Sequence, residues 1–104
     1  MIFEGKWQVI ITTPIGKQSV LLDIIMEDGI FKGTATQGNE TVNFEEIVAV
    51  DNRLNWWQSV TKPLRLRLKF EVVVDDDQMT GTAKAAMFPA SKLVGARSVN
   101  TSKI

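Results

Sequence analysis

Residues 64–74 read LRLRLKFEVVV, and this stretch decides the fold class. Its apolar positions are Leu64, Leu66, Leu68, Phe70 and Val72. The positions between them carry Arg65, Arg67, Lys69 and Glu71. This period of two is typical of a strand with one buried face, because a helix repeats its apolar positions every three or four residues.

The same kind of pattern continues in both directions, and short turn signals separate the runs. One example is Glu27-Asp28-Gly29, which favours a hairpin. The predicted strands span residues 3–12, 17–26, 30–36, 41–50, 54–60, 64–74, 78–87 and 92–99. We therefore expect one all-β domain over residues 1–104, an eight-stranded antiparallel up-and-down barrel. An open or split barrel made of two curved halves is the structural alternative.

The two halves of the chain, approximately residues 1–50 and 51–104, resemble each other. Residues 21–35 (LLDIIMEDGIFKGTA) align without a gap on residues 69–83 (KFEVVVDDDQMTGTA). With a shift of one residue, Trp7 also matches Trp56 and Pro14 matches Pro63. The alignment predicts a repeated four-strand unit, whose apolar face is buried only when two units close on each other.

Composition excludes several classes of function. The chain has no Cys, His or Tyr, which removes thiol chemistry and the commonest general base and metal ligand. Its formal net charge is zero, whereas a nucleic-acid-binding domain carries a basic surplus. Asp75-Asp76-Asp77 cannot converge on one ion from a tight turn. We expect no cofactor, no metal, no nucleic-acid partner and no membrane partner, and, without a recognisable targeting segment, a cytoplasmic location.

Gly5-Lys6-Trp7 in the first predicted strand and Arg97 in the last form a pattern that resembles the calycin superfamily, which includes lipocalins and avidins. The resemblance implies that Trp7 packs at the closed end of the barrel beneath Arg97, and that Gly5 is structural. It also implies binding of a small molecule inside the barrel. The chain departs from the family in being short, in having no flanking helix and in lacking the Tyr of a biotin site.

Two polar residues share the inward parity of apolar neighbours. Glu46 follows Val42 and Phe44 in the run 41–50, and Gln58 follows Trp56 in the run 54–60. A carboxylate inside an apolar barrel could serve as an acid or base, so Glu46 is the candidate catalytic residue. The alternative is that Glu46 pairs with Arg97 or Lys92, or lies in water at a barrel mouth. The candidate ligand-binding residues are Phe44, Glu46, Trp56, Gln58 and Arg97.

Trp57 follows Trp56 directly, so the two side chains of a strand face opposite sides. An outward indole favours an interface, and Ile10, Leu21 and Ile25 share the outward parity. We expect a homo-oligomer, most simply a homodimer, through this surface. The alternative is that these are scattered surface residues, which are common.

Three functions remain open at this stage. The first hypothesis is non-catalytic binding of a small hydrophobic ligand in the barrel. The second is a homo-oligomeric interaction or structural module. The third is an isomerase, cyclase or lyase that uses Glu46 in an apolar cavity.

Overall fold

The computed structural model describes residues 2–61 and 65–98, which form one antiparallel sheet of nine strands. Leu64, Pro63 and the end of the last predicted strand lie outside the described residues. The strands are β1 (Gly5–Thr13), β2 (Gly16–Glu27), β3 (Ile30–Gln37), β4 (Glu40–Asn43), β5 (Glu45–Val50), β6 (Arg53–Val60), β7 (Leu66–Asp75), β8 (Gln78–Ala85) and β9 (Ser91–Arg97).

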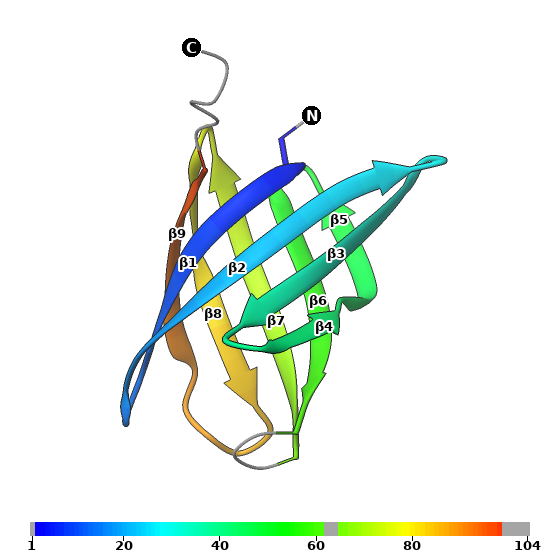
Figure 1. The fold of residues 1–104 in the computed structure, drawn as a ribbon. Helices are drawn as coiled ribbons and strands as arrows, with labels where there is room; N and C mark the ends of the chain where they lie inside the picture. The colour runs from blue at the N-terminus through cyan, green and yellow to red at the C-terminus, as the bar shows by residue number, and fades with distance from the viewer. Residues whose placement is uncertain (1, 62–64, 99–104) are drawn as a thin grey trace.

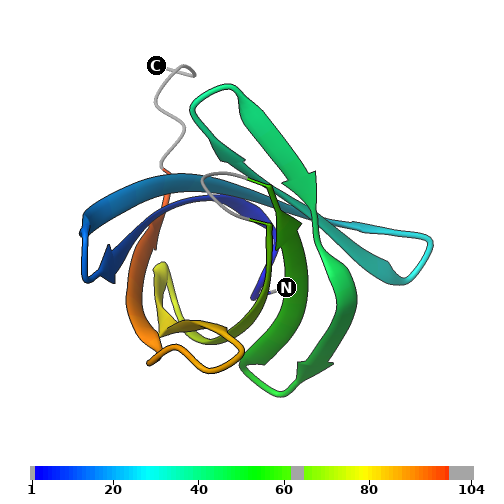
Figure 2. The same ribbon diagram turned by 90° about the horizontal axis from the view of Figure 1, so that it is seen from below.

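The sheet curls into a nearly closed barrel (Figures 1 and 2). Its strand order is β4-β3-β2-β1-β9-β8-β7-β6-β5, so strands consecutive in sequence are paired except β4 and β5, which form the two edges, and β1 also pairs with β9. We call the end with the β1–β2 and β8–β9 turns the open end. The opposite end, which holds the N-terminal segment and Arg97, is the closed end. The predicted antiparallel all-β barrel is confirmed.

The predicted number of strands is wrong, because the run 41–50 breaks at Phe44. β4 pairs with β3, whereas β5 pairs with β6. The register shifts between Glu45 and Val48, and Glu46 has a φ of 50°, so the chain makes a bulge at this point. Phe44 N donates a backbone hydrogen bond of 2.8 Å to Gly33 O. Beyond this bond, β3 and β5 separate and the barrel wall is open.

The inward positions of β7 follow the predicted alternation. Phe70 and Val72 are buried with Val74, and Leu66 and Leu68 are half-buried towards the open end. The charged positions Arg67 and Glu71 face solvent. One continuous core results, because β1, β2, β6, β8 and β9 alternate in the same way and send their apolar side chains into it.

The hairpins β2–β3 and β7–β8 have the same register. Ile24 pairs with Gly33, and Val72 pairs with Gly81. A Cβ at Gly81 would lie 2.0 Å from the carbonyl oxygen of Glu71, which belongs to the neighbouring strand. Glycine at this position is therefore required by the close approach of two backbones.

We expect Gly81→Ala to lower the free energy of unfolding by about 2 kcal/mol, because the added methyl group forces β7 and β8 apart. At an unconstrained strand position the same change would stabilise the fold. Urea unfolding measures the effect, with Thr80→Ala on the exposed face of β8 as the control. A Gly81→Ala protein as stable as the wild type would show that the two strands are not in close contact there.

Candidate functional site

Three aromatic rings stack across the middle of the barrel. The rings of Phe44 and Trp56 lie 4.1 Å apart at an interplanar angle of 8°, and those of Trp56 and Phe70 lie 5.0 Å apart at 2°. All three side chains are buried, Trp56 completely. The stack fills this level of the barrel, so a ligand has space only above or below it.

Gln58 is the buried polar side chain next to this stack, and 4% of it is exposed. Trp56 Nε1 donates a hydrogen bond of 2.8 Å to Gln58 Oε1. The amide oxygen is thereby occupied and the amide is held in one orientation. Its NH2 group remains a donor, and no hydrogen bond from it to another described residue is formed. The nitrogen is not enclosed, since among the described residues the enclosed side-chain atom without a partner is Glu4 Oε1, so water or a ligand in the cup can accept a hydrogen bond from it.

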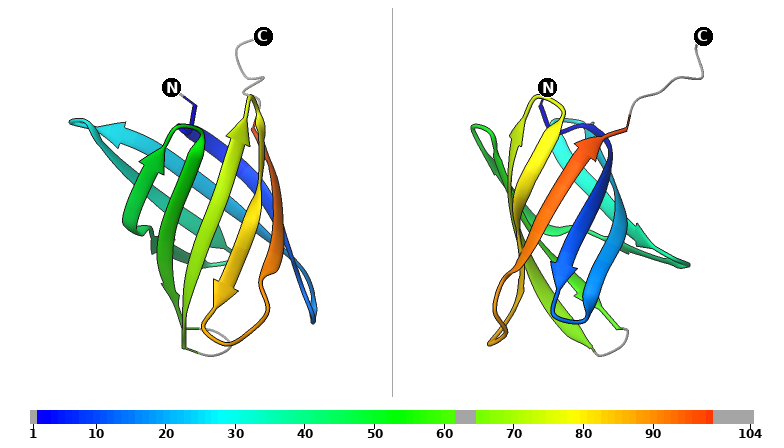
Figure 3. Two further views of the ribbon diagram at one scale, coloured as in Figure 1. Left: turned by 180° about the vertical axis from the view of Figure 1, so that it is seen from behind. Right: turned by 90° about the vertical axis from the view of Figure 1, so that its left-hand side faces the viewer.

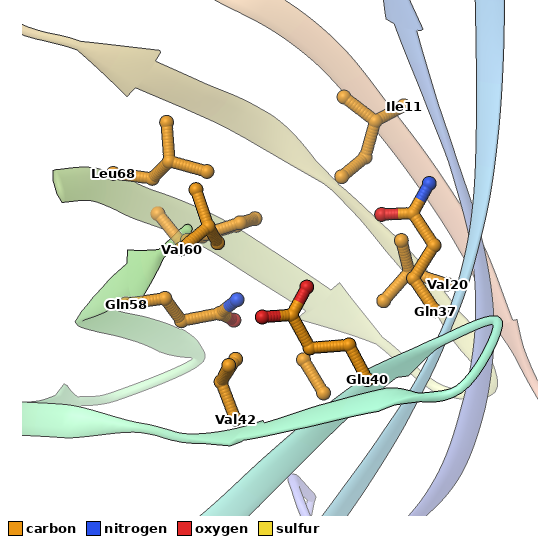
Figure 4. A pocket seen from close by; sticks show the side chains of 10 residues that line it. Ile11, Val20, Gln37, Glu40, Val42, Gln58, Val60 and Leu68 are labelled. Atoms are coloured by element: carbon orange, nitrogen blue, oxygen red, sulfur yellow. The ribbon is translucent and has the colours of Figure 1, made fainter. Parts of the chain in front are cut away.

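A small cup at the open end lies against the Gln58 amide, with a volume of about 70 Å³ (Figure 4). Its walls are apolar, and its polar side chains are Gln37, Glu40 and Gln58. The Glu40 carboxylate and the Gln58 amide point towards each other in Figure 4. The residues that line the cup are Ile11, Val20, Ala35, Gln37, Glu40, Val42, Gln58, Val60, Leu68 and Phe70.

Hydrogen bonds hold the two polar residues at the rim. Glu40 Oε2 accepts a bond of 3.0 Å from Thr61 Oγ1, and Gln37 Nε2 donates to Gln18 Oε1. The cup therefore offers an acceptor on Glu40 and a donor on Gln58, surrounded by apolar walls. This arrangement can bind and orient a polar group.

The closed end is sealed by Arg97 and Trp7. The Arg97 guanidinium carbon lies 4.2 Å from the ring centroid of the fully buried Trp7. Arg97 Nε donates to Asp77 Oδ1 at 2.8 Å, and its terminal nitrogens donate to the carbonyl oxygens of Ile2, Glu4 and Asp76. A Cβ on Gly5 would lie 3.2 Å from Arg97 Nη1, so a small residue is needed there.

The structure separates the predicted ligand-binding residues into groups. Phe44, Trp56 and Gln58 lie together, and Gln58 lines the cup. Arg97 lies at the opposite end of the barrel, among backbone carbonyl groups, and does not line the cup.

The prediction that Glu46 faces the interior is wrong. The bulge at this residue reverses the parity, so that Ile47 packs against the core and the Glu46 side chain is 66% exposed. Glu46 forms an ion pair with Arg67, not with Arg97 or Lys92. The hydrogen bond that Arg67 donates to Glu46 raises the pKa of the Arg67 guanidinium. The hypothesis of a catalytic Glu46 required a buried carboxylate, so the exposure of this side chain removes its basis.

We expect Glu46→Gln to leave the Tm within about 2 °C of the wild type, because exposed ion pairs contribute little to stability. Differential scanning calorimetry at neutral pH measures this. A large drop in Tm would mean that Glu46 is buried after all.

Trp57 is half-buried on the outer wall and is covered by its own sheet. Arg67 lies 4.5 Å and Lys69 5.7 Å from the centroid of its ring. The basic side chains of β7 thus cover the outward indole, for which the sequence alone indicated no contact. Ile10, Leu21 and Ile25 lie on β1 and β2, and β7, β8 and β9 separate them from Trp57 on β6. These residues do not form one continuous patch.

Gln37 and Glu40 lie between the predicted strands 30–36 and 41–50 and were not predicted as site residues, yet both line the cup. The signal was present, because Gln37 continues the inward parity of Gly33 and Ala35, and Glu40 that of Val42 and Phe44. A strand in a barrel keeps its alternation up to the last paired residue, and Gln37 pairs with Glu40.

A second hollow, of about 290 Å³, lies where β3 and β5 part. It is lined by Phe31, Lys32, Gly33, Asn43, Phe44 and Ile47. This seam is wider than the cup, but it opens on the outside of the wall and has no buried polar side chain in its lining. The cup is the better candidate site, because apolar walls and convergent polar groups occur together there.

No family model and no curated protein matches the chain. A solved structure described as a redesigned beta barrel matches with a TM-score of 0.63 and 14% identity, over 92% of this chain and 91% of that one. The fold is that of a small β-barrel. At this identity the likeness shows the fold alone. Residues 2–61 and 65–98 contain neither a helix that could cross a membrane nor a His, Cys, Asp and Glu cluster that could hold a metal.

Proposed function

We propose that the protein binds a small molecule, without catalysis, in the cup at the open end of the barrel. The observation that carries this proposal is the buried Gln58 amide, which is fixed by Trp56 and directs its NH2 group at an apolar cup opposite Glu40. A donor that opens on an apolar cup can be satisfied by a ligand that brings an acceptor.

The chemistry of the cup selects a ligand with one hydroxyl group on an apolar body. A hydroxyl oxygen accepts from the Gln58 NH2 while its hydrogen is donated to the Glu40 carboxylate. The apolar body packs against Val60, Leu68 and Ile11. The cup has about half the volume of an engineered cavity that holds benzene, so only one end of the ligand enters it.

Titration with phenol and with 1-butanol tests this function, measured by protein-observed NMR. We expect a Kd on the order of 1 mM, as suits a small contact area. Val60→Phe fills the cup and is expected to weaken binding at least about tenfold. Ser59→Phe, on the outer face of the same strand, is the matched control and keeps the affinity. Equal affinities in the two variants, or no binding by the wild type, would contradict the proposal.

A calycin-like ancestry with two repeated halves is part of the same proposal. The stacking of Arg97 on Trp7, with Gly5 against the guanidinium, supports the calycin relation. The equal registers of the Ile24–Gly33 and Val72–Gly81 pairs support the repeat. The calycin relation, with one end of the barrel sealed, would predict ligand entry at the open end.

Self-association through the outer wall is the second candidate function. Ile10 and Val94 are paired across β1 and β9, and 38% and 46% of their surfaces are exposed. Sedimentation velocity of the wild type and Val94→Glu tests it. We expect a dimer that Val94→Glu dissociates, and a wild-type monomer at all concentrations would contradict it.

A further inference from the structure

The charges of the turns are divided between the two ends of the barrel, although the formal net charge of the chain is zero. The turns at the closed end carry Glu27, Asp28, Asp51, Asp75, Asp76 and Asp77, which outnumber the basic Lys32, Arg53 and Arg97 at that end. Around the open end, Arg67 is paired with Glu45 and Glu46, and the exposed basic residues outside these pairs are Lys17, Arg65, Lys84 and Lys92. Outside these pairs, Glu40 is the acidic side chain at the open end among the described residues, and it points into the cup. The open end is therefore a cationic surface.

Apolar side chains project from the same end. Ile15, in the β1–β2 turn, is 83% exposed, and Met87 and Phe88, in the β8–β9 loop, are 95% and 58% exposed. The pairing of Thr12 with Lys92 places the turn and the loop next to each other, and Figure 3 shows both at one end of the barrel. Such exposure of large apolar side chains at loop tips has no structural benefit in water.

The four basic residues are not neutralised by acidic side chains within the described part of the fold. None of them forms an ion pair with an acidic residue in the described part of the chain. Lys84 Nζ donates to the carbonyl oxygen of Ala86 at 3.0 Å, which places its charge beside the loop that bears Met87 and Phe88. Cations thus flank the apolar tips.

We propose that the open end docks on an anionic lipid surface. Ile15, Met87 and Phe88 would enter the boundary between headgroups and acyl chains, and the flanking basic residues would face the lipid phosphates. The acidic turns would then point away from the membrane. A soluble polyanion fits the charges but not the apolar tips, and an apolar protein groove fits the tips but not the charges. The proposal departs from the sequence-based expectation of no membrane partner, and it does not depend on a ligand in the cup.

Flotation with vesicles tests the proposal, using phosphatidylcholine alone and phosphatidylcholine mixed with phosphatidylserine. We expect the wild type to bind the mixed vesicles and to be released by high salt. The double variant Met87→Ser and Phe88→Ser is expected to bind at least about tenfold more weakly. The double variant Lys17→Ser and Lys92→Ser should lose about fivefold for each charge removed.

The control is the double variant Ile30→Ser and Val48→Ser, which removes exposed apolar side chains away from the open end. Circular dichroism of each variant establishes that the barrel is folded. The control should bind like the wild type. The proposal is overturned by a lack of binding to mixed vesicles, by equal loss in the control, or by equal binding to phosphatidylcholine alone. Binding to dextran sulfate that is as tight and insensitive to the Met87 and Phe88 changes would make the surface a polyanion site and would also overturn it.

Discussion

Trp56→Ala is expected to lower the free energy of unfolding by about 4 kcal/mol. The indole is completely buried, and it stacks on Phe44 on one side and on Phe70 on the other. Its removal leaves a cavity at the centre of the core and leaves the side-chain oxygen of Gln58 without its hydrogen-bond donor. Because a domain of this size has a total stability of about 5–15 kcal/mol, the loss is a large part of the whole.

The adjacent Trp57 provides a matched control for this experiment. It has the same chemistry and lies on the same strand, but it faces the outer wall and contacts Arg67. We expect Trp57→Ala to cost about 1 kcal/mol, the scale of a partly exposed cation–π contact. Urea unfolding of both variants measures the difference. Equal losses would mean that the assignment of the two indoles to inside and outside is wrong.

Arg97→Met is expected to destabilise the fold by about 3 kcal/mol. Methionine retains most of the apolar stem, so the change isolates the guanidinium. Its donors serve three backbone carbonyl groups and the Asp77 carboxylate, and its face covers Trp7. Arg97→Lys should recover little, because a single ammonium group cannot reproduce the planar fork.

Arg53→Met is the control for this change, since Arg53 is an exposed arginine at the same end of the barrel. Thermal unfolding of the variants compares them. If Arg97→Met and Arg53→Met were equally stable, the guanidinium would not hold the closed end together.

Alternation in the sequence was sufficient to predict most of the wall of this barrel. It assigned the inward faces of Phe70 and Val72 and of Trp56 and Gln58. The period of two is a reliable signal wherever a strand pairs on both sides without interruption. The resemblance of Gly5-Lys6-Trp7 and Arg97 to calycins added the contact between Trp7 and Arg97, which no periodicity predicts.

The errors arise where pairing changes partner. Glu46 continues the parity of Phe44 in the sequence. The chain changes its pairing partner from β3 to β6 at this point, and the bulge that accompanies the change reverses the parity. Nothing in the residues 44–48 indicates the bulge, because its cause is the closing of the barrel between strands distant in sequence. The same tertiary origin explains why the sequence could not show that Arg67 covers Trp57.

The candidate site depends on this wall in a simple way. The aromatic stack lies across the barrel on the inner side of the cup, and Trp56 orients Gln58. The β3–β4 hairpin brings Glu40 to the rim opposite Gln58. The sequence indicated one half of this arrangement, because Gln58 shares the inward parity of Trp56. The other half came from Glu40, the first residue of β4, whose side chain faces inward.

The most direct test of the cup is the indole region of the ¹H–¹⁵N NMR spectrum during a titration with phenol. The Trp56 indole N–H donates to Gln58 Oε1 beside the cup, whereas the Trp7 indole N–H donates to Phe3 O, at 2.9 Å, at the closed end. We predict that the Trp56 resonance moves progressively with phenol and that the Trp7 resonance stays in place. A stationary Trp56 resonance, or a larger shift at Trp7, would contradict a ligand site at the open end.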